Sequence, residues 1–286
     1  MAATRFIVTF LLTTVFVSCK KSESDGIPCY YHLLPPQLLN PDGSFDKVNG
    51  ITDLYVFSQG KNLGVFDSLS YVPDLAEGSV DVSIFAGIKN NSLGQNRIKH
   101  PFLQVYDTAL WLGQGESYSL APVFQYASSS NVDVSRNFES GNTWVESTSQ
   151  AGSVSVVTNS NIALQGVRCG LFQLINNSTS AQFVENNDIA ISPGDNVFLE
   201  LNYSCNNTFG VGVYSYEGAS TERVPILFLN PTTSSSELPT WKKVYIDLGM
   251  IGVQRQNTNK FRIYIDFTTN ETNQPKIYLD NIKVVR

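Results

Sequence analysis

Aromatic and polar side chains alternate along several predicted strands in the carboxyl-terminal half of the chain. An aromatic ring can pack on the apolar face of a sugar, while carboxylates and amides can hydrogen-bond its hydroxyl groups. The alternation places the following side chains of these types on outward faces: Tyr214, Trp241, Tyr245, Tyr264, Glu200, Asn202, Arg262 and Asp266. They are the candidate glycan-binding residues. The alternative is structural, because outward aromatic residues in sheets commonly pack against loops or neighbouring strands.

Residues suited to catalysis are sparse. The chain has two histidines, His32 beside Pro35 and Pro36 and His100 before Pro101, and neither shows the spacing of a Ser/His/Asp or metal arrangement. The sequence also lacks a Gly-rich nucleophile elbow, a P-loop and an HExxH motif. Paired carboxylates for glycoside hydrolysis need only spatial proximity, so the sequence leaves that reaction open. We expect a protein that is not an enzyme.

The elements that must position these side chains are strands. Helical periodicity is nearly absent, whereas alternating β-branched and aromatic runs broken by Gly, Asn and Pro recur along the chain, which is typical of sandwiches and barrels. Residues 54–57 and 63–66 flank turn residues at 59–62 and predict a hairpin. The predicted fold class is all-β.

Length and composition favour two tandem β-sandwich domains. Hydrophobic residues make up 42% of the chain and charged residues 15%, which supplies ample material for buried cores. A polar stretch of small residues at 125–131 reads as a linker or long surface loop. We therefore expect a small sandwich at 27–124, a linker at 125–136 and a second sandwich at 137–286.

Two strands of the second half carry further information. At 197–204 the odd-numbered residues form one face, and the even-numbered residues, including Glu200 and Asn202, form the other. In the last strand the hydrophobic alternation changes parity between Leu279 and Ile282. That change predicts a β-bulge near Asp280 and Asn281.

Three cysteines remain besides Cys19, namely Cys29, Cys169 and Cys205, and no CxxC or Cys/His cluster accompanies them to hold zinc. Cys169 and Cys205 lie at buried parities of their strands. They form either a disulfide or a pair of buried free thiols, and the second outcome is favoured.

The first residues predict an export signal. Arg5 precedes an apolar and threonine-rich run at 6–16, which is too short to span a bilayer as a stable helix. Ser18 followed by Cys19 resembles the lipobox of bacterial lipoproteins, which implies removal of residues 1–18 and lipidation of Cys19. Buried acyl chains would anchor the protein stably to a membrane. The alternative is a secretory signal with an incidental cysteine.

Residues 19–26 form a polar, flexible tether in which basic residues precede acidic ones. This order resembles the signals with which Bacteroidota send lipoproteins to the outer face of the outer membrane. The resemblance implies a lipid-anchored protein of the outer membrane that faces the cell exterior. Residues 1–18 contain one charged residue, Arg5, so the mature chain keeps 18 basic and 25 acidic residues. Because nucleic-acid binding needs clustered basic residues, nucleic acid is excluded as a partner.

Three segments resemble carbohydrate-binding-module or galactose-binding-like jelly rolls: 137–141 (NFESG) followed by Trp144, 241–248 (WKKVYIDL) and 277–284 (IYLDNIKV). They look like the opening, a middle and the closing strand of that fold, so the second sandwich is expected to be a jelly roll. The resemblance also implies that Glu139 and Asp280 hold a structural calcium ion, which prefers oxygen ligands. The alternative is a pair of solvated carboxylates at strand ends. No cofactor is required.

The first half resembles the small Ig-like or PEGA-type sandwiches of bacterial envelope proteins, and the whole arrangement is similar to lipoproteins of Bacteroidota. It implies a non-catalytic binding module at the cell surface, whose jelly roll binds glycans. The alternative is a structural or interaction subunit of an outer-membrane protein complex, for nutrient uptake or outer-membrane protein assembly, with no glycan ligand.

Overall fold

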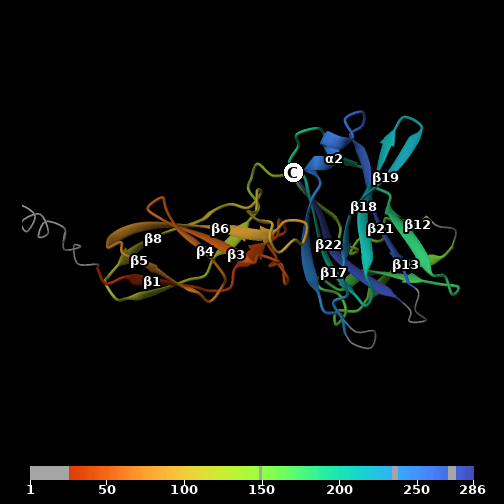
Figure 1. The fold of residues 1–286 in the computed structure, drawn as a ribbon. Helices are drawn as coiled ribbons and strands as arrows, with labels where there is room; N and C mark the ends of the chain where they lie inside the picture. The colour runs from red at the N-terminus through yellow and green to blue at the C-terminus, as the bar shows by residue number, and fades with distance from the viewer. Residues whose placement is uncertain (1–25, 148–149, 234–237, 270–274) are drawn as a thin grey trace, which may run out of the picture.

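The protein consists of two β-sandwiches joined end to face. The computed structural model describes residues 26–147, 150–233, 238–269 and 275–286. The predicted signal peptide, Cys19 and the tether up to residue 25 lie outside them. The first sandwich is elongated, and one of its ends meets the sheet of the second that contains β17 and β22 (Figure 1). The predicted all-β fold class is confirmed.

The first sandwich contains ten strands in three small sheets. They are β1 (Cys29–Leu33), β2 (Gln37–Leu39), β3 (Asp53–Ser58), β4 (Lys61–Phe66), β5 (Tyr71–Asp74), β6 (Gly78–Lys89), β7 (Arg97–Lys99), β8 (Tyr106–Leu112), β9 (Ser117–Leu120) and β10 (Val123–Gln125). The sheet orders are β5-β1-β9, β10-β2 and β4-β3-β6-β7 with β8 on β6. Inward side chains of these sheets, such as Tyr31, Val56 and Ile84, form one core.

The predicted hairpin is confirmed as β3 and β4, which pair antiparallel. Gln59 and Gly60 connect them with φ values of 48° and 76°. Two positive φ values in a two-residue loop match the twist of the flanking strands, and glycine tolerates this conformation.

The second sandwich is a jelly roll of two six-stranded sheets. Its strands are β11 (Val132–Arg136), β12 (Trp144–Glu146), β13 (Gly152–Thr158), β14 (Arg168–Leu174), β15 (Ser180–Glu185), β16 (Ile189–Ala190), β17 (Phe198–Cys205), β18 (Phe209–Glu217), β19 (Ser220–Leu229), β20 (Lys242–Asp247), β21 (Lys260–Thr268) and β22 (Lys276–Val285). One sheet has the order β13-β14-β22-β17-β20 with β11 on β22, and the other β12-β15-β21-β18-β19 with β16 on β21.

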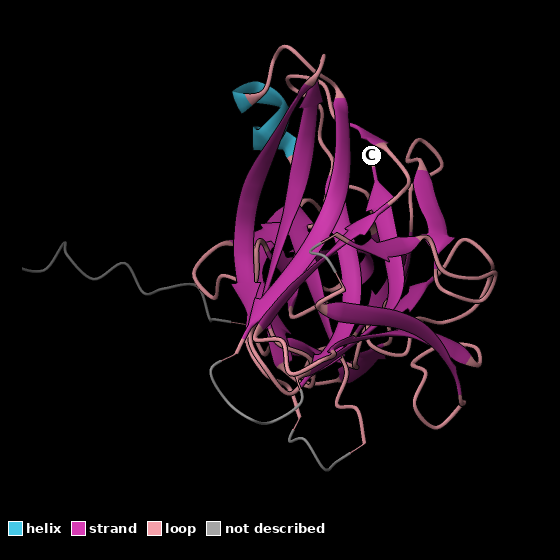
Figure 2. Ribbon diagram, turned by 90° about the vertical axis from the view of Figure 1, so that its right-hand side faces the viewer, coloured by secondary structure: helices cyan, strands magenta, loops and turns pink. Residues whose placement is uncertain are grey.

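A core rich in aromatic and β-branched residues fills the space between these two sheets, with Phe172, Phe183 and Ile265 fully buried. Figure 2 shows the two layers and the short helix α2 (Gly249–Gln254) at one end of the sandwich. Among the described residues no helix has the length and apolar character needed to cross a membrane. Cys29, Cys169 and Cys205 are buried free thiols, which is the outcome favoured for Cys169 and Cys205.

The predicted bulge in the last strand is confirmed. The pairing of β22 with β17 shifts register between Glu200, opposite Lys283, and Asn202, opposite Asp280. One extra residue of β22 is thus left unpaired, and Asn281 has a φ of 48°. The bulge reverses the parity of the strand and aims Asp280 and Asn281 away from the regular alternation.

The first sandwich covers the edge strand β20. Asn90 forms a parallel bridge with Tyr245, and the Asn91 N–H donates to the Tyr245 carbonyl at 2.9 Å. Phe198, Tyr245 and Val285 of the second sandwich pack with Ile88 and Phe102 of the first. Covering an edge strand removes unpaired backbone groups that would otherwise attract another chain.

Residues 125–136, predicted as the linker, comprise the end of β10, a short connection and all of β11.

Candidate functional site

The eight predicted glycan-binding residues fall into two groups on opposite sheets. In the first group, Glu200 and Asn202 lie on β17, Tyr245 lies on β20 and Trp241 directly precedes β20. In the second group, Tyr214 lies on β18, and Arg262, Tyr264 and Asp266 lie on β21. The eight residues therefore do not form one glycan-binding face. Alternation along a strand reports which residues share a side of that strand, but it does not report which sheet the strand joins.

Glu200 and Asn202 are not outward at all, because the first sandwich covers them. Both are fully buried, and Tyr245 is 2% exposed. The Asn202 side chain donates to the Val48 carbonyl at 2.9 Å, and the Tyr245 hydroxyl donates to the Asn49 carbonyl. These three residues hold the sandwiches together, so a sugar cannot reach Glu200 or Asn202 in this arrangement.

Glu200 belongs to a buried ion cluster that we define as Asp46, Glu200, Lys243 and Lys283. Lys243 Nζ lies 2.8 Å from Asp46 Oδ2 and 3.0 Å from Glu200 Oε2, and Lys283 Nζ lies 3.3 Å from Asp46 Oδ2. Because Asp46 comes from the first sandwich and the other three from the second, the charges balance only when the sandwiches are docked. Alternation along β17 predicts an outward position for Glu200, and the docked first sandwich buries that side chain.

The protonation of the cluster follows from its contacts. Burial opposes ionisation of Glu200, but Lys243 and the His100 hydrogen bond hold the pKa of Glu200 well below its usual range. Burial likewise opposes the charge on Lys243, whereas Glu200 raises the pKa of Lys243 well above its usual range. Burial and the neighbouring Lys243 lower the pKa of Lys283 to about 8. Lys283 is therefore the member that loses its charge first as pH rises.

Neither histidine adds a catalytic arrangement. His100 Nδ1 accepts the Phe102 N–H at 3.2 Å, which leaves Nε2 as the protonated nitrogen, 3.1 Å from Glu200 Oε1. His100 is buried against the ion cluster. His32 stacks on Tyr71 with ring centroids 4.4 Å apart.

On the opposite sheet the predicted residues contact neighbouring side chains, and Arg262 pairs with Asp188. The Arg223 guanidinium lies 4.8 Å from the ring centroid of Tyr264 and pairs with Asp266. Tyr264 is 1% exposed, and the Tyr214 hydroxyl donates to Gln182. This face therefore presents no open ring of Tyr264 to a ligand.

Trp241 instead lines a cleft between the two sandwiches, which we call the interdomain groove. Its volume is about 680 Å³, and residues within 48–52 and 89–93 of the first sandwich face residues within 227–230 and 241–245 of the second. The Trp241 Nε1 donates to the Ile162 carbonyl at 3.1 Å, which fixes the half-buried ring. Phe228, on the same groove, is 72% exposed.

The groove is preformed by contacts across the junction. The Asp247 N–H donates to Asn91 Oδ1 at 2.9 Å, which attaches the 89–93 loop to β20. Gly50 approaches so closely that a Cβ there would lie 3.1 Å from side-chain atoms of Lys243 and Tyr245. The described residues that line the groove include Lys89, Lys242 and Lys243 but no Asp or Glu. Sequence reasoning missed Phe228, which lies on a strand of the other sheet of the same sandwich, and Lys89, which only the docking of the sandwiches brings to the groove.

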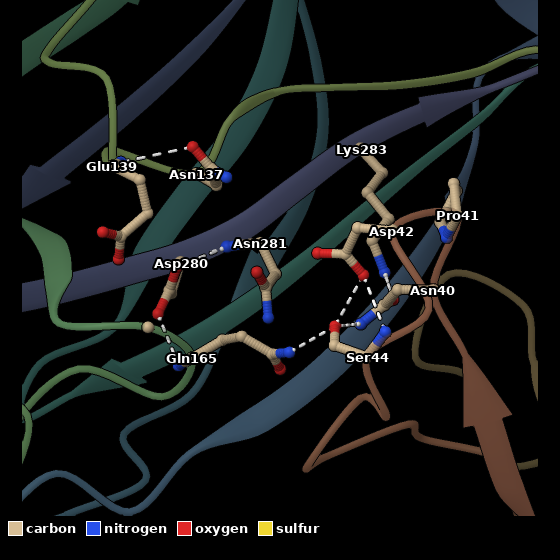
Figure 3. A pocket seen from close by; sticks show the side chains of 11 residues that line it. Asn40, Pro41, Asp42, Ser44, Asn137, Glu139, Gln165, Asp280, Asn281 and Lys283 are labelled. Atoms are coloured by element: carbon tan, nitrogen blue, oxygen red, sulfur yellow. Dashed lines mark hydrogen bonds between the residues drawn. The ribbon is translucent and has the colours of Figure 1, made fainter.

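Glu139 and Asp280 do come together, in a second cavity of about 320 Å³ (Figure 3). We call it the junction pocket, because it is lined by Asn40, Pro41, Asp42 and Ser44 of the first sandwich and by Asn137, Glu139, Gln165, Gly166, Asp280, Asn281 and Lys283 of the second. Gln165 Nε2 donates to Ser44 Oγ at 2.7 Å and links the two walls.

Backbone amides hold both carboxylates in the pocket. Glu139 Oε1 accepts the N–H groups of Val167 and Arg168, each at 2.9 Å. Asp280 Oδ2 accepts those of Leu164 and Gln165 at 3.1 and 3.0 Å. Burial raises the pKa of Asp280 to about 7 in spite of these bonds, and the Glu139 charge acts in the same direction. Asp280 is 1% exposed, so the alternative of solvated carboxylates is wrong for it.

The junction pocket offers oxygen ligands, which calcium prefers, but few of them are carboxylates. Two carboxylates with the amide side chains of Asn137 and Asn281 beside them offer the oxygen atoms that calcium prefers. Within the described ranges, no three His, Cys, Asp or Glu side chains gather to hold a metal ion. Glu139 and Asp280 would hold the ion, and amide or backbone oxygens would have to complete its shell.

Comparison with known proteins gives a similarity of fold only. No protein-family model matches the chain, and no curated protein matches it. Matching solved structures include TmCBM61 in complex with β-1,4-galactotriose, at 17% identity over 52% of this chain and 93% of that one with a TM-score of 0.34. A family 11 carbohydrate-binding module of a Clostridium thermocellum cellulosomal cellulase matches at 14% identity, covering 54% and 94% with a TM-score of 0.39. A family 29 module matches at 11%, covering 55% and 88% with a TM-score of 0.35.

Proposed function

We propose that this protein is a glycan-binding, non-catalytic lipoprotein and that the interdomain groove is its glycan site. The observation that carries the proposal is Trp241, whose ring is fixed in a preformed cleft of about 680 Å³ beside the exposed Phe228. Aromatic rings in a cleft offer platforms for the apolar faces of sugar units, and a preformed site avoids the entropic cost of ordering its walls. Asn91, Ser92 and Asn230 supply polar edges for hydroxyl groups.

Charge narrows the class of glycan. The chain has a net charge of −6, yet Lys89 and Lys242 line the groove without an acidic lining residue among the described ones. Lys243 is already neutralised by Asp46 and Glu200. Glycans that carry carboxylate groups are therefore favoured over neutral glycans at this groove.

The Trp241→Ala variant is expected to bind groove ligands at least about fivefold more weakly, because stacking of a ring on an aromatic side chain contributes about 1–3 kcal/mol where it is known for nucleobases. A glycan array that includes uronic-acid oligosaccharides identifies the ligand, and titration calorimetry measures the affinity of each variant. Trp111→Ala is the matched control, since Trp111 is 77% exposed on β8, outside the groove. Equal affinity of Trp241→Ala and wild type would refute the site.

Membrane attachment is proposed to depend on Cys19, which lies outside the described residues. The Cys19→Ala variant is expected to move from the membrane fraction to the soluble fraction, because lipid chains are what hold a tethered domain on a bilayer. Cys29→Ser is the control, because Cys29 is a buried thiol of β1. Fractionation of cells that carry each variant makes the measurement, and membrane retention of Cys19→Ala would contradict the anchor.

A second candidate function is that of an interaction subunit in an outer-membrane complex. The observation that favours it is the set of exposed apolar side chains on the first sandwich, of which Trp111 at 77% and Leu75 at 62% are the clearest. Aromatic side chains such as that of Trp111 are enriched in protein–protein interfaces relative to the rest of the surface. Co-purification of native membrane complexes tests it, and a glycan array without hits would favour it over the groove.

A further inference from the structure

The junction pocket contains hydrogen-bonding groups that neither sandwich satisfies. Asn281 Nδ2 and Gln165 Oε1 are buried and have no hydrogen-bond partner in the part of the chain that the structure describes. Both residues line the pocket, and Figure 3 shows their side chains near each other between the Asp280 and Ser44 walls. A buried polar group without a partner costs free energy, so its retention calls for a physical reason.

The backbone holds Asn281 in place at a further cost. Asn281 is 8% exposed and adopts the left-handed region with a φ of 48° at the bulge of β22. Residues held in that region are concentrated at binding sites, where the surrounding structure fixes them. The bulge thus delivers an unpaired amide into a cavity that could hold a partner for it.

The remaining polar groups of the pocket define what that partner must be. Gln165 Nε2 is committed to Ser44 Oγ, and Lys283 Nζ donates to Asn40 Oδ1 at 2.6 Å. What remains includes one free amide donor, one free amide acceptor and the carboxylates of Asp42, Glu139 and Asp280. A hydroxyl group both donates and accepts, so it satisfies such a mixed set, whereas the carboxylates repel an anionic ligand.

Size and composition set the scale of the ligand. A volume of about 320 Å³ lies at the lower end of ligand pockets and suits one ring-sized unit. The described residues that line the pocket include no aromatic side chain, so recognition acts on hydroxyl edges and not on the face of a ring.

We propose that the junction pocket binds a single neutral, hydroxyl-rich unit through Asn281 and Gln165. Its walls come from both sandwiches, so the ligand also bridges the junction. This site is separate from the interdomain groove, whose lining residues it does not share.

The test is titration calorimetry of the purified full chain with D-galactose, D-glucose, D-mannose and myo-inositol, with calcium chelated. Millimolar affinity for at least one probe is expected, and D-galacturonate should bind more weakly than D-galactose. Sugars and inositol share vicinal hydroxyl groups, so their relative affinities tell a sugar unit from a free polyol. An absence of binding by all four neutral probes at about 10 mM would overturn the proposal.

Variants assign the binding to this pocket. Asn281→Gly removes the amide while glycine accepts the same backbone conformation, so a tenfold or greater loss of affinity with an unchanged melting temperature is expected. Asn177→Gly is the matched control, since Asn177 is exposed with a φ of 54°. Unchanged affinity in Asn281→Gly would overturn the proposal, as would loss of monosaccharide binding in Trp241→Ala. If calcium binds while no hydroxylated probe does, the pocket is a cation site and the proposal fails.

Discussion

Replacement of Glu200 by glutamine is expected to lower the free energy of unfolding by about 3–5 kcal/mol and to loosen the junction between the sandwiches. Two carboxylates and two ammonium groups balance in the cluster, with side chains that are at most 3% exposed. Glutamine keeps the shape but leaves one buried positive charge without a partner. Breaking a buried pair in this way costs far more than breaking one in water, because solvent cannot screen the charge that remains.

A surface ion pair of the same chain provides the control. Glu222 pairs with Arg255 at side-chain exposures of 57% and 30%. Glu222→Gln is therefore expected to change stability by less than about 1 kcal/mol. Chemical denaturation of wild type and both variants gives the comparison. Equal stabilities of Glu200→Gln and Glu222→Gln would mean that the cluster contributes nothing to the junction.

Proteolysis adds a readout that is specific to the junction. In the docked state the Ala127 N–H donates to the Phe102 carbonyl at 2.8 Å, and the Asn131 N–H donates to the Arg286 carbonyl at 2.7 Å. If the cluster holds the sandwiches together, Glu200→Gln should be cut faster within 127–131, because local opening exposes the backbone. Unchanged cleavage with reduced stability would place the effect inside the second sandwich.

The pH dependence of the same variant follows from the sign of the pKa shift. The pKa of Glu200 is lower in the folded protein than in the unfolded chain, so its stabilising contribution is present above about pH 4.3 and is lost as pH falls below that value. The stability difference between wild type and Glu200→Gln should therefore shrink on acidification. A difference that stays constant down to about pH 3 would contradict the charge-based account.

Strands β17 and β22 show which features of the fold the sequence predicts. Alternation correctly separated Leu199 and Leu201 from Glu200 and Asn202, and the parity change correctly predicted the bulge at Asp280 and Asn281. These features are local, since a strand has a side-chain period of two and a bulge shifts that period by one residue. The fold class followed from the same signals.

The sequence could not show what covers each face. Glu200, Asn202 and Tyr245 have the pattern of a solvated sheet, yet the first sandwich buries them. The interdomain groove is likewise assembled from five separate segments, and no local period reports their contact. One signal was available: Phe198 and Tyr245 alternate with charged residues on that side, and a face that mixes large aromatics with charges is suited to burial against a partner.

The last expected result concerns Asp280 and calcium. In the absence of calcium, the free energy of unfolding should fall as pH rises from about 4 to 7, because the folded protein keeps a proton on Asp280 that the unfolded chain has released. The pKa of Asp280 is raised from 3.8 to about 7, chiefly by burial. At about 1.4 kcal/mol per pKa unit, the ionised carboxylate costs up to about 4 kcal/mol at pH 8.

A calcium ion at Glu139 and Asp280 would reverse that cost. Calcium binds the ionised carboxylate in the folded state only, so it should stabilise the protein more at pH 8 than at pH 5. When the calcium concentration is a hundred times the dissociation constant, the free energy of unfolding should rise by about 2.7 kcal/mol. Asp280→Asn should lose both the pH slope and the calcium response, while its amide oxygen can still accept the N–H groups of Leu164 and Gln165. Asp188→Asn, at an exposed pair with Arg262, should keep both. If the melting curves at pH 8 are the same with chelator and with about 1 mM calcium, no calcium ion binds here and Asp280 is a buried carboxylate that lowers stability.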